Sequence, residues 1–203
     1  MIENLLVAGA RIRWTKPNTV AQAQDGSIVA SVNAGNPMTY LGSTQAQPRG
    51  GLFHRAPRVY QAPANTPVPH TWLDYIPGRT AYVGQGHDVL TGFMSGCLIA
   101  RGTYNGAMSV FHMGTVENPV ATNLVKIGFR TDLPGNASGF YPAAAWTVGE
   151  RAATGMATDI VALVTSAGSF YSILLCHGVN EYIVGGIKKV PPLNRVAIMA
   201  RLM

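Results

Sequence analysis

Two apolar runs on either side of Asn105-Gly106 constrain the fold of this chain more than any other feature of its sequence. The first run begins at Cys97 and reads Cys-Leu-Ile-Ala-Arg-Gly, and the second reads Ala-Met-Ser-Val-Phe-His and ends at His112. An Asn-Gly pair near such runs is a strong signal for a tight β-hairpin, because both residues tolerate a positive φ. We therefore expect two antiparallel strands here, joined by a short turn.

The hairpin predicts that Cys97 and His112 lie on one face of a sheet. If residues 103–106 form the loop, Cys97 lies directly across from His112; if Asn105-Gly106 alone form the turn, the register shifts and the pair become diagonal neighbours. Both registers leave the side chains on the same face, since strand side chains alternate with a period of two. A thiol attacks as its thiolate and an imidazole is its usual base, so the spacing favours a nucleophilic Cys-His pair. The competing interpretation is that both side chains merely pack in a core.

Strand-like runs recur through the chain, between turn signals supplied by 23 Gly and 13 Pro. Helix signals are fewer: Asn118 is a predicted N-cap with Pro119 at the first helical position, and residues 141–153 are predicted to form a second helix. Strands on both sides of the hairpin and few helices predict an α+β fold in a single domain, residues 1–203. Strands are expected at residues 4–8, 27–33, 159–165, 169–176, 181–184 and 195–202.

The segment 45–77 is rich in Pro, Gly and Gln. Proline removes backbone donors and disfavours central strands, so we expect this segment to form long ordered loops packed over the core. Long loops near a catalytic site often form the wall that faces the substrate. Arg49, Arg55 and Arg58 are therefore predicted to contact the substrate.

Composition narrows the classes of partner. The net charge is +6, but its basic residues are scattered rather than gathered in a block with aromatics, so nucleic acid is not an expected partner. A mildly basic surface would suit an acidic protein target, but a solvated surface without a partner is the favoured interpretation of this charge. No apolar run reaches the length of a membrane span. Five His and two Cys offer no close ligand pair of the zinc type, so neither a metal nor a cofactor is expected. The chain is expected to be a monomer.

The run Thr91-Gly-Phe-Met-Ser-Gly-Cys97 resembles the signature of the toxin glutamine deamidases, the group that contains cytotoxic necrotizing factor and Burkholderia lethal factor. That family has a Leu-Ser-Gly-Cys motif, with the nucleophilic Cys last and a downstream His as its partner. The lethal-factor branch also has a functional Thr six residues before the Cys, which here is Thr91. Met94 stands where the family usually has Leu, a change that conserves volume. The gap of fifteen residues between Cys97 and His112 is closer to the necrotizing-factor pattern.

The resemblance implies a β-sandwich-like core of mixed sheets with surrounding helices, and a reaction that converts a protein glutamine to glutamate. Cys97 would be the nucleophile and His112 the acid and base. Thr91 would hold His112 or shape the loop before Cys97. Backbone amides at Cys97 and in the Ser95-Gly96 turn would bind the oxyanion, with Gly96 allowing an unusual backbone angle and a close substrate approach.

The same resemblance implies a bacterial effector that is secreted or injected and acts in the host cytosol. Its target would be the host translation-initiation RNA helicase, as in the lethal-factor branch, or a Rho-family GTPase, as in the necrotizing-factor branch. A chemoreceptor-type glutamine deamidase is a rival interpretation, although that family has Gly-Ser-Cys where this chain has Ser-Gly-Cys. A non-enzymatic β-rich binding module and a cysteine protease are two further interpretations of the same residues, and His87 is a second candidate base.

Overall fold

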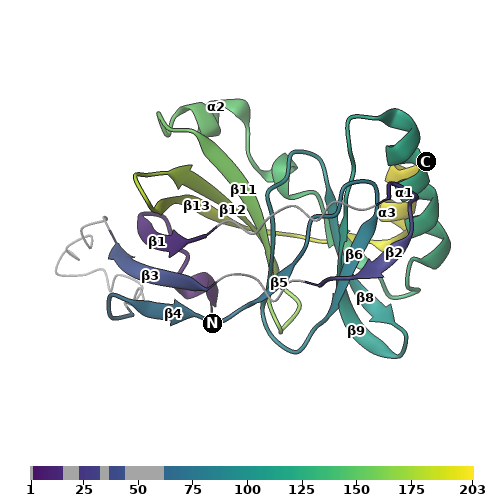
Figure 1. The fold of residues 1–203 in the computed structure, drawn as a ribbon, viewed down its shortest axis with the longest axis horizontal. Helices are drawn as coiled ribbons and strands as arrows, with labels where there is room; N and C mark the ends of the chain where they lie inside the picture. Colours follow the sequence, from purple (N-terminus) through teal and green to yellow (C-terminus); the bar gives the residue numbers. More distant parts are fainter. Residues whose placement is uncertain (1, 16–22, 33–36, 44–61) are drawn as a thin grey trace, which may run out of the picture.

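The structure is a computed structural model that describes residues 2–15, 23–32, 37–43 and 62–203. It contains two mixed β-sheets, one of eight strands and one of six, and three α-helices. The predicted α+β class with a sheet-rich core is thus confirmed. Figure 1 shows the larger sheet on the left and the smaller one on the right, with α1 and α3 beyond it.

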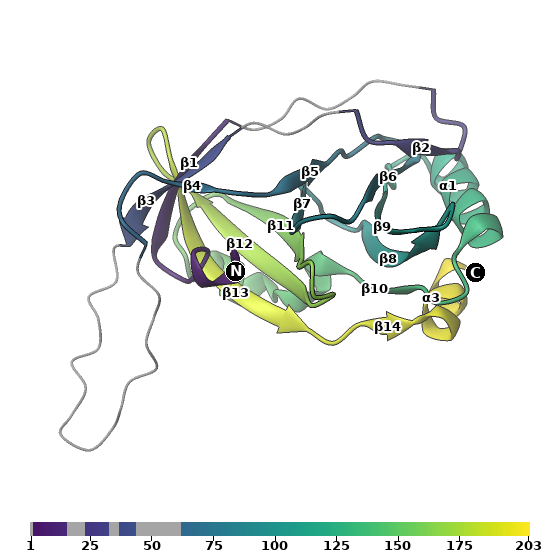
Figure 2. The ribbon, with the colours of Figure 1, turned by 90° about the horizontal axis from the view of Figure 1, so that it is seen from below.

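The eight-stranded sheet, here the large sheet, curls around its own core. Its strand order is β4 (Thr66–Val68), β3 (Met38–Ser43), β1 (Ala10–Trp14), β13 (Tyr182–Val190), β12 (Phe170–His177), β11 (Thr158–Val164), β7 (Val89–Gly92) and β5 (Thr71–Leu73). The two edge strands, β4 and β5, are consecutive in the chain and separated only by Pro69 and His70. Trp14 on β1 meets Trp72 on β5 with 5.1 Å between ring centroids, which brings the two sides of the curl together. Figure 2 shows this arrangement from below.

The six-stranded sheet, here the small sheet, packs against one face of the large sheet. Its order is β14 (Leu193–Asn194), β10 (Ser138–Phe140), β8 (Leu98–Tyr104), β9 (Ala107–Met113), β6 (Thr80–Gly84) and β2 (Ile28–Ala30). Ile99 and Val110 from this sheet share a core with Ile160, Ala162 and Phe170 from the large sheet. Residues 160–164 of β11 are all buried because this core covers one face and the core inside the curl covers the other.

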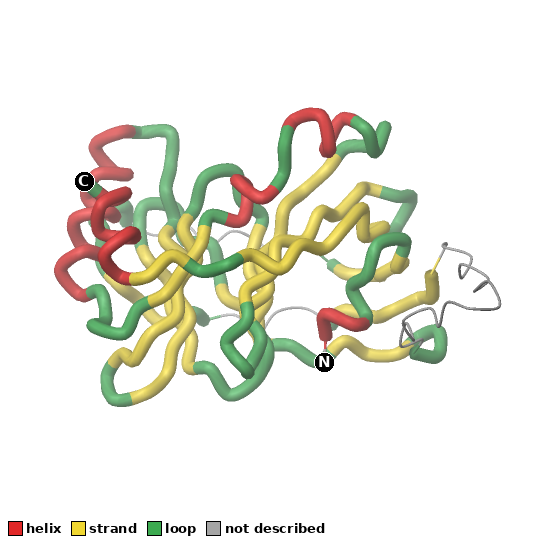
Figure 3. The backbone as a smooth tube through the Cα atoms, turned by 180° about the vertical axis from the view of Figure 1, so that it is seen from behind, coloured by secondary structure: helices red, strands yellow, loops and turns green. Residues whose placement is uncertain are grey.

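Helices α1 (Pro119–Asp132) and α3 (Arg195–Leu202) cover the outer face of the small sheet, and Figure 3 shows them side by side near the C-terminus. The predicted cap of α1 is confirmed: Asn118 Oδ1 accepts hydrogen bonds from the amides of Val120 and Ala121. Phe129 of α1 packs on Phe111 of β9 with 5.7 Å between ring centroids. Proline and an Asx cap at the start of an apolar-periodic run were therefore enough to locate this helix.

Two predicted strands are wrong. Residues 195–202 form helix α3 rather than a strand, because Asn194 caps the segment and Ile198 and Leu202, one turn apart, are both buried. The first strand is β1, and residues 4–8 contain the end of the 3₁₀ helix η1 (Ile2–Asn4) and a turn.

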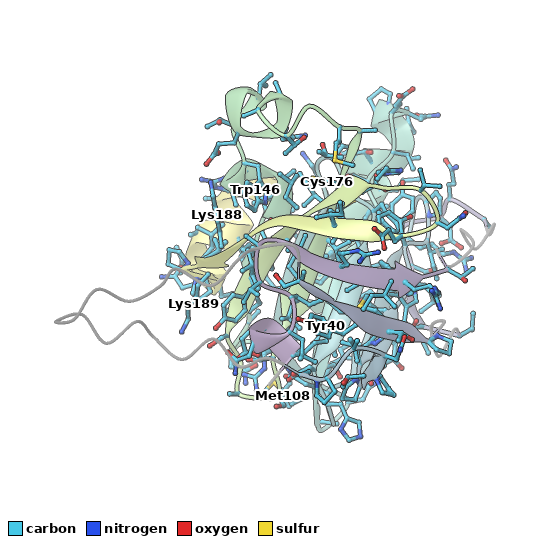
Figure 4. All side chains as sticks on the ribbon, turned by 90° about the vertical axis from the view of Figure 1, so that its left-hand side faces the viewer. Tyr40, Met108, Trp146, Cys176, Lys188 and Lys189 are labelled. Carbon is cyan, nitrogen blue, oxygen red and sulfur yellow. The ribbon has the colours of Figure 1, made fainter. Side chains whose placement is uncertain are left out.

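The predicted helix over residues 141–153 is interrupted. It consists of a 3₁₀ helix, η2 (Pro142–Ala145), and a short helix, α2 (Val148–Ala152), with Trp146 extended between them. Trp146 Nε1 donates to Ser172 Oγ at 2.8 Å, and Lys188 Nζ lies 4.3 Å from the centroid of the indole ring. Figure 4 shows Trp146 beside Lys188, so a tertiary contact overrides the local helix propensity of this segment.

The Pro-rich segment is only partly irregular. Its described part contains strands β4 and β5, which contradicts the prediction of loops throughout. Pro67 is exposed on β4, an edge strand, which is the position where a sheet tolerates proline. Arg49, Arg55 and Arg58 lie outside the described residues, so their predicted contact with substrate remains a prediction.

Candidate active site

The hairpin of β8 and β9 uses the two-residue turn. Asn105 and Gly106 have φ values of 49° and 79°, and Tyr104 pairs with Ala107. Two consecutive positive φ values match the twist of the flanking strands, which is why Asn-Gly is favoured here. His112 consequently pairs with Ile99, and Cys97, two residues earlier, is its diagonal neighbour.

Cys97 and His112 share the face of the hairpin that is turned toward the large sheet. Cys97, Ile99 and Val110 belong to the core between the sheets, whereas Leu98 and Phe111 face the helices. His112 lies opposite Ile99 and therefore points the same way. Exposed fractions are 4% for Cys97 and 0% for His112, so both groups are withdrawn from water.

Thr91 connects the large sheet to His112. Thr91 is the third residue of β7, and its Oγ1 lies 2.5 Å from His112 Nδ1, with both residues fully buried. His112 Nε2 is buried and has no hydrogen-bond partner among the described residues. In the tautomer in which Nδ1–H donates to Thr91, Nε2 keeps its lone pair and is the nitrogen that accepts a proton.

The sulfur of Cys97 has a different partner from the one that the spacing suggested. Within the described residues, Sγ contacts Thr115 Oγ1 at 3.6 Å and makes no hydrogen bond to His112. The backbone N–H groups of Thr115 and Gly96 also favour the thiolate. Ser95 and Gly96, the two residues that precede the buried Cys97, are exposed.

Burial opposes charge on both members of the pair. Burial raises the pKa of the Cys97 thiol above its usual value, against the effect of hydrogen bonds from Thr115 and Gly96. Burial lowers the pKa of His112 to about 3, against the attraction of Asp74. Burial therefore favours the neutral thiol and the neutral imidazole over a thiolate–imidazolium pair.

The sequence did not predict three residues that lie near the pair: Asp74, Tyr75 and Thr115. Asp74 is 1% exposed, and its Oδ2 accepts hydrogen bonds from Ser31 Oγ at 2.7 Å and from the amide of Val32 at 2.9 Å. Tyr75 donates its hydroxyl to the carbonyl of Thr115 at 2.9 Å, and its ring centroid lies 5.4 Å from that of His112. Asp74 and Tyr75 follow strand β5, in a segment whose prolines had predicted loops.

The remaining candidate residues are Gly96 and His87, and Cys176 is the second cysteine of the chain. Gly96 is not among the described glycines with positive φ, so the expected unusual backbone angle is not present. A Cβ at Gly96 would meet nothing within 4 Å, which leaves open space for an approaching group. His87 is exposed. Cys176 is a buried thiol on β12, and burial raises its pKa.

The described part of the chain holds no group of three or more His, Cys, Asp or Glu side chains that could bind a metal ion. Nor does it contain a helix with the length and apolar character needed to cross a membrane. Comparison of the chain with protein-family models, with curated proteins and with solved structures found no match. Function therefore has to be inferred from the chemistry of the site and from the motif that ends at Cys97.

Proposed function

We propose that this protein is a cysteine-dependent glutamine deamidase, which converts a glutamine side chain of a protein substrate to glutamate. The observation that carries the proposal is the Thr91–His112 contact of 2.5 Å beside Cys97, on the same face of one hairpin. It supplies a nucleophile, a base and a group that fixes the tautomer of the base. A Cys-His pair can support several reactions, and the resemblance of residues 91–97 to the toxin deamidase signature favours glutamine deamidation among them.

In the proposed reaction, Cys97 Sγ attacks the carboxamide carbon while the thiol proton passes to His112 Nε2. The carbonyl oxygen becomes an oxyanion, for which the amides of Cys97 and the Ser95-Gly96 turn are the nearest backbone donors in the sequence. His112 then returns the proton to the nitrogen, the C–N bond breaks, ammonia leaves and a thioester remains. Water attacks the thioester with His112 as base, which releases glutamate and restores the thiol.

The neutral resting state is compatible with this sequence of steps. Thiolate and imidazolium are each disfavoured alone by burial, but each stabilises the other when one proton transfer forms both. Proton transfer is then coupled to attack on the substrate rather than completed beforehand. A thiol of this kind reacts slowly with small reagents and rapidly only with a substrate that fits the site.

The substrate class follows from the motif. We place the protein among secreted or injected bacterial effectors that act in the host cytosol. Thr91, at the position of the functional Thr in the lethal-factor branch, favours the translation-initiation RNA helicase as target. The gap of fifteen residues between Cys97 and His112 favours a Rho-family GTPase as the second candidate.

Mass spectrometry of the two candidate targets, and of a whole host lysate, tests the proposal. We expect the mass gain of an amide-to-acid change at one glutamine after incubation with the wild-type protein. Cys97→Ser should abolish this gain, because a hydroxyl is not ionised by the same imidazole, and Cys176→Ser should preserve it. Conversion that persists in Cys97→Ser, or no conversion of any glutamine by the wild type, would reject the proposal.

A further inference from the structure

The segment immediately after β9 is anchored at nearly every backbone group. Gly114 donates its N–H to the carbonyl of Arg79 and accepts from the N–H of Gly78, both at 2.8 Å. A Cβ at Gly114 would overlap the carbonyl oxygen of Ile76, so only glycine fits this close approach. The chain is thereby held against the loop between β5 and β6, one residue before Thr115.

The residues that follow Gly114 are held equally firmly. The carbonyl of Thr115 accepts a hydrogen bond from the Tyr75 hydroxyl at 2.9 Å. The N–H of Thr115 donates to the carbonyl of Met113 at 3.0 Å and also favours the Cys97 thiolate. The backbone of Val116 bonds through both its N–H and its carbonyl to Thr122 Oγ1. The remaining polar group of Thr115 is its hydroxyl, which lies 3.6 Å from Cys97 Sγ.

We propose that Thr115 is a further catalytic residue, whose hydroxyl donates a hydrogen bond to the Cys97 sulfur as it becomes a thiolate, and that Tyr75 is a positioning residue that holds Thr115 in place. This inference rests on the proposed function and adds a second threonine to it. Thr91 orients the base, and Thr115 stabilises the nucleophile. No bond to Thr115 is made or broken during the reaction.

A hydroxyl at this place has a physical consequence for the sulfur. A hydrogen bond to a charged acceptor is stronger than one to its neutral form, so the donor favours thiolate over thiol. Fixing the donor through the Thr115 carbonyl and through Gly114 removes the cost of orienting it at each turnover. Thr115 is half-buried, whereas Cys97 and His112 are buried.

The test uses the full chain with Cys176→Ser, in which Cys97 is the remaining one of the two cysteines. The rate of alkylation by iodoacetamide is measured from neutral to alkaline pH. Thr115→Val should move the profile to higher pH and slow alkylation at pH 8 about tenfold, the size expected for one hydrogen bond to a charged group. Thr115→Ser should restore the original profile, and Tyr75→Phe should move it in the same direction by a smaller amount.

Thr131→Val is the matched control, because Thr131 is an exposed helix residue whose hydroxyl donates to the carbonyl of Ile127. If Thr115→Val does not fold, Thr115→Ala removes the same hydroxyl. A profile for either folded variant that superimposes on the parent overturns the inference. Turnover of glutamine is measured separately: a Thr115-dependent profile without any glutamine conversion supports the stabilising role of Thr115 and rejects the deamidase proposal instead.

Discussion

At the scale of single residues, each member of the candidate pair contacts a threonine hydroxyl: His112 contacts Thr91, and Cys97 contacts Thr115. The period-two alternation of strands predicted the common face of Cys97 and His112, and the structure places the pair in the second of the two registers considered. Asp74 and Tyr75 were not predicted, because they reach the pair only through the packing of a segment distant in the sequence, and Thr115 was not, because its contact with Cys97 depends on how the chain turns after β9. Local pattern carries no information about such contacts.

Thr91→Val should impair the reaction more than the fold. The substitution conserves shape but leaves His112 Nδ1 buried without a partner, at a cost of about 1–3 kcal/mol in the free energy of unfolding. We expect glutamine conversion to fall about a hundredfold, because the imidazole loses the contact that selects its tautomer. Thr91→Ser should recover most of the rate, and a Thr91→Val protein with undiminished turnover would show that another group orients His112.

The buried imidazole also makes stability depend on pH. The pKa of His112 is about 3 in the folded protein and near 6.5 in the unfolded chain, so between these values only the unfolded state binds the proton. The contribution of His112 is thus fully present above about pH 6.5 and is lost as pH falls toward 3, by about 1.4 kcal/mol per pH unit.

Urea unfolding of His112→Asn between pH 4 and 7 checks this dependence. The asparagine does not titrate, so we expect the free energy of unfolding to change less steeply with pH than in the wild type. Other groups, including His70, keep their own pH dependence in both proteins, so only the difference between the two slopes is diagnostic. Equal slopes would mean that His112 is solvated in the folded state.

At the scale of elements, the sequence predicted best where one local rule was sufficient. The Asn-Gly turn, the capped helix α1 and the strands β11 and β12 follow from turn chemistry, capping and apolar runs. Helix α3 was mistaken for a strand because its short apolar run fits both periods, and only its burial against the small sheet selects the helical one. Strands β4 and β5 were hidden by neighbouring prolines that edge strands tolerate.

Two glycines that flank strand β8, Gly96 before it and Gly106 after it, provide a matched test of the hairpin. A Cβ would meet nothing within 4 Å at either Gly96 or Gly106, but only Gly106 has a positive φ, of 79°. Gly106→Ala should therefore lower the free energy of unfolding by about 1 kcal/mol through backbone strain alone, whereas Gly96→Ala should leave it nearly unchanged. Thermal melts of the two variants decide the matter, and equal melting temperatures would contradict the turn geometry.

At the scale of the whole molecule, the large sheet curls so that its own strands enclose a core, whereas the small sheet packs against the large sheet and the helices. Trp14 and Trp72 bring opposite sides of the curl into contact, and Trp72 is 2% exposed. The small sheet lies between helices on one face and the large sheet on the other. This arrangement depends on pairings between distant segments, which is why the sequence predicted the sheet-rich class but not the order of the strands.

Closure of the curl can be tested at Trp72. Trp72→Ala removes one of the two rings that face each other across the curl, and we expect the free energy of unfolding to fall by about 3–5 kcal/mol. Val179→Ala is the control, since Val179 is 89% exposed and its truncation should cost less than about 0.5 kcal/mol. A loss near that of the control would mean that the two sides of the large sheet are held together elsewhere.

The contact between Thr91 and His112 joins the large sheet to the small sheet, so it can form only when the two sheets dock during folding. A chain whose hairpin has formed, but whose sheets have not yet docked, has the cysteine and the histidine without the hydroxyl that orients the ring. On refolding from denaturant, enzymatic competence should therefore return together with burial of the core between the sheets, and later than the hairpin itself. Until the two sheets dock, the proposed site lacks the group that orients the imidazole, so the proposed activity requires the tertiary structure and not the hairpin alone.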